Sequence, residues 1–319
     1  MSYILSIGEI LGRFTTENNK LIKNSTEFSF NYGGTEANVL ISLSSLGEKC
    51  VFISRLPNNS FGEGAVNLLK EYSINVDNIT FDNELNLGFY FVENACSSRE
   101  RNVVYNRKNT AITNINIKDY SLREVVKCAS LFHFSGISLV LSESLREMIR
   151  ECLKFAKEFN IPVSFDFNYR SNLLSVGEAK KLYKEFILQA DYVFASSWDL
   201  KTFLDLKEED ERLIFEKSCE YYKYIFTKHK TFIEPNKQKV TAYCYSKNYM
   251  IQSKEFEFEY IDKIGAGDAF SAGILFGVLN KSPIEKTLEF GIANLALVQS
   301  KLIDYSTFKI DELEEFIGK

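Results

Sequence analysis

The chain has 319 residues, of which 45% are hydrophobic and 25% are charged, and its formal net charge is −5. This length allows one large α/β domain with a well-buried core, and the mild charge, spread along the chain, excludes the basic stripe that binding to nucleic acid requires. No apolar run approaches a membrane span and the start carries no basic leader, so a cytoplasmic protein with no membrane or nucleic-acid partner is expected.

Apolar β-rich runs alternate with amphipathic runs along most of the chain. Near the start, strands are predicted at 3–10 and 50–56, and helices at 36–47 and 62–72. From about residue 120 the alternation resumes, and strands and helices are predicted in turn at 131–137, 142–160, 161–167, 177–190 and 191–196. Because a parallel sheet is covered on both faces, this order predicts an α/β fold with a central, mostly parallel sheet flanked by helices.

Two stretches, about 12–32 and 87–107, break this pattern. They contain "EFSFNY", "LGFYFVE" and "RNVVYNR", in which apolar and polar residues alternate without helical spacing. This alternation predicts antiparallel strands with one solvent-facing side. We interpret them as one small β-sheet, inserted into a single domain of residues 1–319, that projects beside the main sheet as a lid.

The predicted lid strands carry phenylalanine at alternating positions, namely Phe28, Phe30, Phe89 and Phe91. An apolar face of this size is too large to leave exposed on an isolated lid. The pattern therefore predicts a homo-oligomer, a dimer or higher, that pairs through the lid sheet. Part of the same face is expected to cover the substrate.

A pair of glycines precedes the first predicted helix, in "NYGGTEANVLISLSSLG". Gly33 and Gly34 allow a ligand to approach the backbone closely, and Asn38 falls in the first turns of the helix. This arrangement is suited to a ligand that carries several hydroxyl groups.

A second glycine-rich turn, "DKIGAGDAF", leads into an apolar helix near the end of the chain. Gly265 and Gly267 allow positive φ and close approach, and the helix directs its free N–H groups and its dipole toward the turn. The turn is therefore a candidate phosphate cradle, in which Asp268 would accept a proton from a hydroxyl. The alternative is that Asp268 only caps the helix.

With the first motif in the first quarter of the chain and the second in the last, the chain resembles the ribokinase-like (PfkB) carbohydrate kinases over essentially its whole length. The resemblance implies a three-layer α/β fold, with ATP and Mg²⁺ as cofactors. It also implies that Asp268 is the catalytic base and that Gly265, Ala266 and Gly267 form the anion hole beside the nucleotide.

A narrower resemblance, to 2-keto-3-deoxygluconate kinases, is carried by "GEILGRFT", "FNYGGTEANV", "LGFYFVE", "VVYNR", "FDFNYRSNL" and "IDKIGAGDAF". Arginine binds a carboxylate through two parallel hydrogen bonds, which suits the acid group of such a substrate. The resemblance implies that Gly33, Gly34 and Asn38 bind the sugar, Tyr90 and Tyr105 its oxygens or its face, and Arg107 and Arg170 its acid group, with Asn168 as a further candidate.

The nucleotide side departs from the pattern of these relatives, which usually have N-x-x-E after the strand at 191–196. This chain has "SSWD", with Ser196 in place of asparagine and Asp199 at the acidic position, where a role in binding Mg²⁺ is expected. Serine lacks the two donors of the amide, so weaker activity is expected. Thr227 and Lys228 match positions that contact the nucleotide. The base pocket would fall near residues 293–298, whose pattern equally fits helix packing.

Each assignment has a structural alternative. Arg107 could be a solvated lid charge, and Arg170 could belong to a surface ion pair. Tyr90 and Tyr105 could form a cross-strand pair. Thr227 and Lys228 could have a helix-capping or surface role, and Asp166 and Asn168 could organise Arg170 rather than contact substrate.

The expected activity is that of an ATP-dependent kinase that phosphorylates the primary hydroxyl of a sugar acid, with 2-keto-3-deoxygluconate as the leading substrate. One alternative is a fructokinase or another kinase of neutral sugars. The other is a catalytically weakened sensor that binds sugar acids, which "SSWD" favours and Asp268 opposes.

Overall fold

The predicted alternation forms one central sheet in the computed structural model, which describes residues 2–94 and 99–319. Residues 95–98 of the predicted lid segment lie outside the described residues. The strand order is β13 (Tyr249–Gln252), β12 (Lys237–Ser246), β11 (Tyr224–Glu234), β10 (Tyr192–Phe194), β9 (Val163–Asp166), β8 (Ala129–Ser135), β1 (Tyr3–Ile7), β4 (Cys50–Pro57) and β5 (Ile79–Asp82), and β14 (Phe256–Glu259) also pairs with β12. Neighbours from β11 to β5 are parallel, and the pairs that β12 makes are antiparallel.

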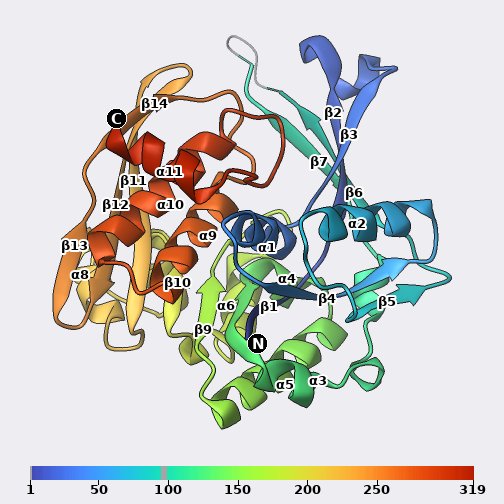
Figure 1. Ribbon diagram of the computed structural model, residues 1–319, viewed down its shortest axis with the longest axis horizontal. Helices are drawn as coiled ribbons and strands as arrows, with labels where there is room; N and C mark the ends of the chain where they lie inside the picture. Colours follow the sequence, from blue (N-terminus) through green and yellow to red (C-terminus); the bar gives the residue numbers. More distant parts are fainter. Residues whose placement is uncertain (1, 95–98) are drawn as a thin grey trace.

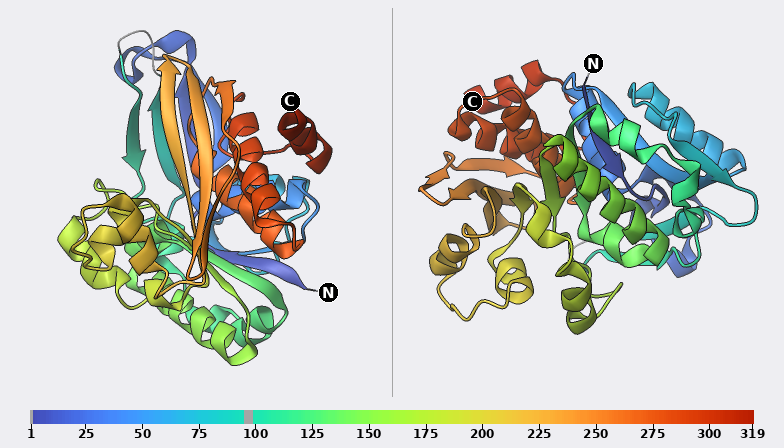
Figure 2. Two further views of the ribbon diagram at one scale, coloured as in Figure 1. Left: turned by 90° about the vertical axis from the view of Figure 1, so that its left-hand side faces the viewer. Right: turned by 90° about the horizontal axis from the view of Figure 1, so that it is seen from below.

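Helices cover both faces of this sheet, as the right-hand view of Figure 2 shows. One layer consists of α1 (Thr35–Ser45), α2 (Ser60–Glu71), α9 (Ala266–Leu279), α10 (Ile284–Val298) and α11 (Ile310–Gly318). The other consists of α3 (Leu122–Lys127), α4 (Gly136–Leu141), α5 (Glu143–Phe159), α6 (Val176–Tyr183), α7 (Ser197–Phe203) and α8 (Glu211–Ser218). Successive residues of β1, Ile4 and Leu5, belong to separate cores on opposite faces, because side chains alternate along a strand. The predicted three-layer α/β fold is confirmed.

Short 3₁₀ helices connect several of these elements, at Glu17–Asn19, Ile22–Asn24, Ala111–Asn114, Ile117–Asp119 and Ile187–Gln189. Across residues 2–94 and 99–319, every helix is too short or too polar to cross a membrane.

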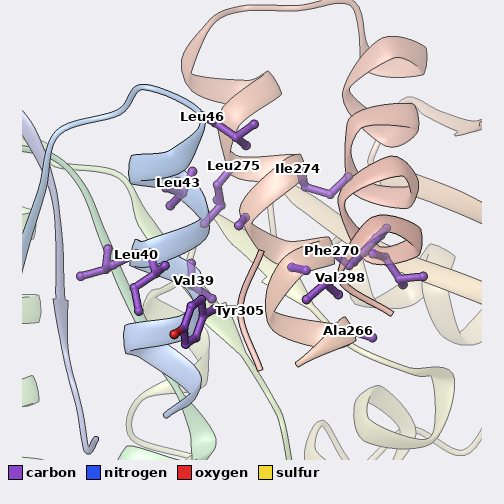
Figure 3. Close-up of a cluster of buried hydrophobic side chains, with 14 of the residues drawn as sticks. Val39, Leu40, Leu43, Leu46, Ala266, Phe270, Ile274, Leu275, Val298 and Tyr305 are labelled. Atoms are coloured by element: carbon purple, nitrogen blue, oxygen red, sulfur yellow. The ribbon is translucent and has the colours of Figure 1, made fainter. Parts of the chain in front are cut away.

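The helices that follow the two glycine-rich motifs pack against each other. Leu43 on α1 and Leu275 on α9 lie between the two helices, in one buried apolar cluster (Figure 3). Both helices are buried on nearly every side, and the buried residues of α1 include polar ones such as Glu36 and Asn38. Their packing brings together two sequence motifs that lie at opposite ends of the chain.

The small sheet is present and projects from the main body beside α2 (Figure 1). Its strand order is β3 (Phe28–Gly33), β2 (Leu11–Thr16), β6 (Gly88–Glu93) and β7 (Asn102–Asn106). The outer pairs are antiparallel as predicted, whereas the central pair, β2 with β6, is parallel. The reason is topological: β2 and β6 each begin an excursion out of the main body, so they run in the same direction, and β3 and β7 return.

Candidate active site

Two adjoining cavities meet at the start of α9, and the outer one lies over the carboxyl ends of β9 and β10. The outer cleft has a volume of about 690 Å³ and the inner pocket about 100 Å³. Ligand sites of open α/β sheets gather at this edge. The residues that line both cavities are Tyr90, Tyr105, Arg170, Ile264, Gly265 and Asp268.

The G-A-G-D turn begins α9 with Gly265, whose φ of 74° is in the left-handed region. A Cβ atom at Gly265 would lie 1.7 Å from the carbonyl oxygen of Asp304, so only glycine fits. Among the described residues, the N–H groups of Gly267 and Asp268 have no hydrogen-bond acceptor. Gly267 also lines the outer cleft. The turn therefore has the features of an anion site at a helix N-terminus.

Asp268 is buried at the boundary between the two cavities. Its Oδ2 accepts a 2.7 Å hydrogen bond from Nδ2 of Asn38. Burial raises the pKa of Asp268 well above its usual value, Asp166 raises it further, and Asn38 and Arg170 oppose the shift. Because the N-cap of α9 is Gly265 and Asp268 accepts no hydrogen bond from a described backbone N–H group, the capping alternative is wrong.

The first motif lies on the inner pocket. Gly34, the N-cap of α1, lines this pocket, and a Cβ atom there would lie 2.1 Å from the carbonyl oxygen of Glu9. Asn38 also lines the pocket, and its Oδ1 accepts a 3.2 Å hydrogen bond from the N–H of Gly34. Its side chain therefore joins the glycine motif to Asp268. Gly33 lines neither cavity and lies against Asp304 and the hydroxyl of Tyr90.

Tyr90 and Tyr105 are directly opposite each other on β6 and β7, and their rings stack with centroids 5.8 Å apart. Both tyrosines also line both cavities. They therefore form the cross-strand pair and occupy the predicted site position at the same time. Phe89 and Phe91 point to the other face of the lid, where Phe14 packs against both, because side chains alternate along β6. The expectation that this phenylalanine face covers the substrate is therefore wrong.

Arg107 lines the inner pocket and is paired with Glu9, a residue to which the sequence analysis assigned no role. The two side chains are only 8% and 5% exposed. Thr110 donates a 2.9 Å hydrogen bond to the other carboxylate oxygen of Glu9. Arg107 is thus not a solvated lid charge, and part of its guanidinium is already occupied. In the sequence, Glu9 appeared only within "GEILGRFT", one of the segments that resemble 2-keto-3-deoxygluconate kinases.

Arg170 lines both cavities and is exposed. Its guanidinium makes no ion pair or hydrogen bond with any residue in 2–94 or 99–319, so the surface ion-pair alternative is wrong. Asn168, at φ 36°, lines the outer cleft and donates a 3.2 Å hydrogen bond to Thr35. The N–H of Asn168 donates to Asp166 at 3.0 Å, which organises the loop that leads to Arg170.

The "SSWD" segment forms a capping box at the start of α7. The hydroxyl of Ser196 donates a 2.6 Å hydrogen bond to Oδ2 of Asp199, and the N–H of Asp199 donates to Ser196 at 3.2 Å. Both residues line the outer cleft. Burial raises the pKa of Asp199 and of Asp166, and both side chains line the outer cleft.

Three lysines line the outer cleft. Thr227 and Lys228 lie within β11, not at a helix cap, and they line the cleft together with Lys230 and Lys263. The ammonium group of Lys228 lies 4.1 Å from the centroid of the Phe270 ring. By contrast, residues 293–298 lie within α10 and line neither cavity, as helix packing would require. Lys230 and Lys263 were assigned no role from the sequence, although Lys230 follows Lys228 by two positions and therefore lies on the same face of the strand.

A buried ionic network connects the lid to the G-A-G-D turn, and no sequence pattern had indicated it. Arg13 on β2 is fully buried, pairs with Asp262 at 2.7 Å and also pairs with Asp304. The hydroxyl of Tyr90 donates to Asp304, and Arg101 pairs with Asp262 at 2.5 Å. Asp262 and Asp304 flank the turn, so three lid residues hold the backbone that surrounds Gly265.

Among the described residues, the outer cleft offers a divalent cation two carboxylates besides that of Asp268. The described residues contain no group of three or more His, Cys, Asp and Glu side chains that could hold a metal ion. Asp166 and Asp199, however, line the same cleft as the G-A-G-D turn. This sparse donor set fits Mg²⁺, which protein carboxylates usually hold together with waters and phosphate oxygens.

Comparison with known proteins gives one consistent result. The family profile described as pfkB family carbohydrate kinase matches residues 1–305. A 2-dehydro-3-deoxygalactonokinase of Haloferax volcanii is 26% identical, over 98% of this chain and 96% of the relative. A 5-dehydro-2-deoxygluconokinase of Clostridium beijerinckii is 30% identical, over 98% and 92%. The crystal structure of 2-dehydro-3-deoxygluconokinase from Thermotoga maritima is 28% identical, with a TM-score of 0.93 and complete coverage of both chains.

Proposed function

The chain belongs to the pfkB family of carbohydrate kinases, and on this premise we propose that it transfers a phosphoryl group from ATP to the primary hydroxyl of a six-carbon keto-deoxy sugar acid. We propose 2-keto-3-deoxygluconate, also written 2-dehydro-3-deoxygluconate, as the leading substrate. The names of the relatives describe acids of one chemical type: each has a carboxylate, a ketone and one missing hydroxyl. Their differences lie in the position of the ketone and in stereochemistry.

One observation carries the choice of an acid over a neutral sugar. The inner pocket is lined by Asp268 and by two guanidinium groups, those of Arg107 and Arg170. Glu9 neutralises Arg107, whereas Arg170 has no acidic partner within ion-pair distance among the described residues. A carboxylate would supply that partner through paired hydrogen bonds, and Arg107 would complete the recognition with the part of its guanidinium that Glu9 leaves free.

In the proposed reaction, Asp268, Asn38 and the G-A-G-D turn each have a separate role. Asp268 accepts the proton of the substrate hydroxyl, and burial, which raises its pKa, makes its ionised carboxylate a stronger base. Asn38 fixes the orientation of the carboxylate through its 2.7 Å hydrogen bond. The N–H groups of the G-A-G-D turn stabilise the charge on the transferred group, since phosphoryl transfer depends mainly on positioning and charge neutralisation.

ATP would occupy the outer cleft, with its phosphates toward Gly265 and Gly267. Thr227 and Lys228 contact the phosphate chain in this arrangement. When bound, Mg²⁺ would neutralise part of the phosphate charge, and Asp166 and Asp199 are the side chains that would hold it. Ser196 serves this site indirectly, because its hydrogen bond orients Asp199.

We further propose that two copies of the chain pair through the outer face of the lid. Phe14, Phe28, Phe30, Phe89 and Phe91 form a half-exposed cluster on this face, with neighbouring ring centroids 4.9 to 6.2 Å apart. An apolar cluster on a projecting sheet favours association with a second surface of the same kind.

A coupled assay of ADP release tests the proposed function. The assay compares 2-keto-3-deoxygluconate, 2-keto-3-deoxygalactonate and 5-keto-2-deoxygluconate with fructose and ribose. We expect kcat/KM for at least one acid to exceed that for either neutral sugar by more than about tenfold, the value of one charge-assisted contact. Higher kcat/KM for fructose or ribose would support the neutral-sugar alternative, and acid binding without ADP release would support the sensor.

A further inference from the structure

Lys230 and Lys263 reach the outer cleft from two different elements. Lys230 follows Lys228 by two positions on β11, so both side chains lie on the same face of the strand. Lys263 lies in the loop that leads into the G-A-G-D turn. All three lysines line the cleft together with Gly265 and Gly267. The cleft that contains the anion site at the helix N-terminus is therefore lined by three lysines from two elements.

These lysines lack the acidic partners that their neighbours have. None of the three lies within 4.0 Å of a carboxylate oxygen in residues 2–94 or 99–319, whereas Lys237 on β12 pairs with Glu257 at 2.5 Å. Lys263 instead lies over the rings of Phe232 and Tyr260, 4.0 and 4.4 Å from their centroids. What sets these three lysines apart is their position, because all of them line one cleft beside the G-A-G-D turn and two of them, Lys228 and Lys230, are half-buried there.

The charged groups around Lys228 and Lys230 differ in sign. Asp166, Asp268 and Asp199 favour the charged form of Lys228, although burial lowers its pKa. Burial also lowers the pKa of Lys230, to about 7, and its charged neighbours there are Lys228 and Lys263, which lower it further. The cluster is self-repelling at Lys230, and an anion with several charges would remove the repulsion.

We propose that Lys230 and Lys263 bind the polyphosphate chain of the nucleotide and, with Lys228, extend the anion hole of the G-A-G-D turn along the outer cleft. The proposal deepens the proposed function and rests on it for the identity of the nucleotide. It predicts that affinity depends chiefly on the number of phosphates. The two lysines also supply positive charge to this cleft. Ser196 stands there in place of the asparagine that relatives usually have, whose side-chain amide could contact phosphate directly.

The test is the binding of ATP and of inorganic tripolyphosphate to the full chain, measured by calorimetry and by the fluorescence of Trp198. Trp198 is the single tryptophan of the chain and lines the outer cleft. The variants are Lys230→Met and Lys263→Met, which keep an unbranched apolar side chain, and Lys237→Met is the matched control on the adjoining strand. Thermal melting verifies that all of them fold.

We expect Kd for both ligands to rise about tenfold in each cleft variant and to stay unchanged in the control, because each variant loses a charge-assisted contact. The difference should shrink at high salt, and Lys230→Arg should retain most of the affinity. If both cleft variants bind ATP and tripolyphosphate as tightly as the wild type, the proposal is overturned. Lysine-dependent binding without phosphorylation of any sugar would refute the proposed function and leave this inference standing.

Discussion

Nδ2 of Asn38 donates a 2.7 Å hydrogen bond to Oδ2 of Asp268, across 230 positions of sequence. The contact joins the glycine motif at the start of α1 to the G-A-G-D turn at the start of α9. It exists because the two helices pack side by side through residues such as Leu43 and Leu275 (Figure 3). The base of the proposed reaction is therefore oriented by the motif that the sequence assigned to sugar binding.

Asp268→Asn should lower kcat by several orders of magnitude while the affinity for sugar and nucleotide changes little. The substitution removes the proton acceptor but preserves the shape of the turn, because Gly265 remains the N-cap of α9. Steady-state kinetics and calorimetric titration of both ligands measure the two effects. Near wild-type turnover in this variant would refute the assignment of Asp268 as the base.

Asn38→Ala should move the acid side of the pH profile of kcat/KM to higher pH. The hydrogen bond from Asn38 favours the ionised form of Asp268, so its loss raises a pKa that burial has already raised. Since the base acts only when ionised, relative activity should fall more at about pH 6 than at about pH 8. An activity loss that is equal at every pH would mean that Asn38 acts on the substrate alone.

Arg107→Met should destabilise the protein by about 3 kcal/mol, because it leaves the carboxylate of Glu9 buried without its partner. The double variant Glu9→Gln/Arg107→Met should recover most of that stability in thermal and denaturant unfolding.

In the double variant, kcat/KM for the sugar acid should still fall about ten- to a hundredfold, while any slow turnover of fructose stays nearly unchanged. Arg107→Lys should recover only part of the acid activity, since an ammonium lacks the planar fork. Equal losses on both substrates would show that Arg107 only supports the lid.

Arg13→Leu should be among the most destabilising substitutions in the chain, at about 3 to 5 kcal/mol, because it leaves Asp262 and Asp304 buried and short of positive charge. Arg101→Met, which removes a partly exposed arginine from the same network, should cost much less. Denaturant unfolding compares the two. A small effect of Arg13→Leu would show that the network does not hold the lid against the G-A-G-D turn.

The proposed pairing through the lid predicts a dimer at micromolar concentration. Phe91→Glu places a charge within the phenylalanine cluster and should yield a monomer. Phe81→Glu, at an exposed phenylalanine of β5 outside the lid, is the control and should leave the dimer intact. Analytical ultracentrifugation reports the molecular mass, and a monomeric wild type would contradict the proposed interface.

The sequence alone predicted the parallel sheet, the two helical layers and the small inserted sheet, because each depends on local periodicity. Apolar runs of strand length alternate with amphipathic runs, and the lid strands alternate residue by residue. It also placed Asp268 in a glycine-rich turn before a helix, since glycine and the helix N-terminus have a chemistry that is visible in a few residues. The sequence did not predict the direction in which the central lid strands pair. β2 and β6 are parallel because both run outward from the main body of the protein, and this depends on the topology of the whole chain.

The tertiary structure alone decided which charges meet. Glu9 neutralises Arg107 from 98 positions away, and Arg13 reaches Asp304 across 291, and neither pair has a spacing that a sequence pattern could reveal. The same is true of Lys263, which joins Lys228 and Lys230 only because the loop before α9 lies beside β11, with the Lys263 ammonium over the ring of Phe232. Burial then determines the consequence of each meeting: it raises the pKa of Asp268 and lowers that of Lys230, since removing water penalises whichever form is charged.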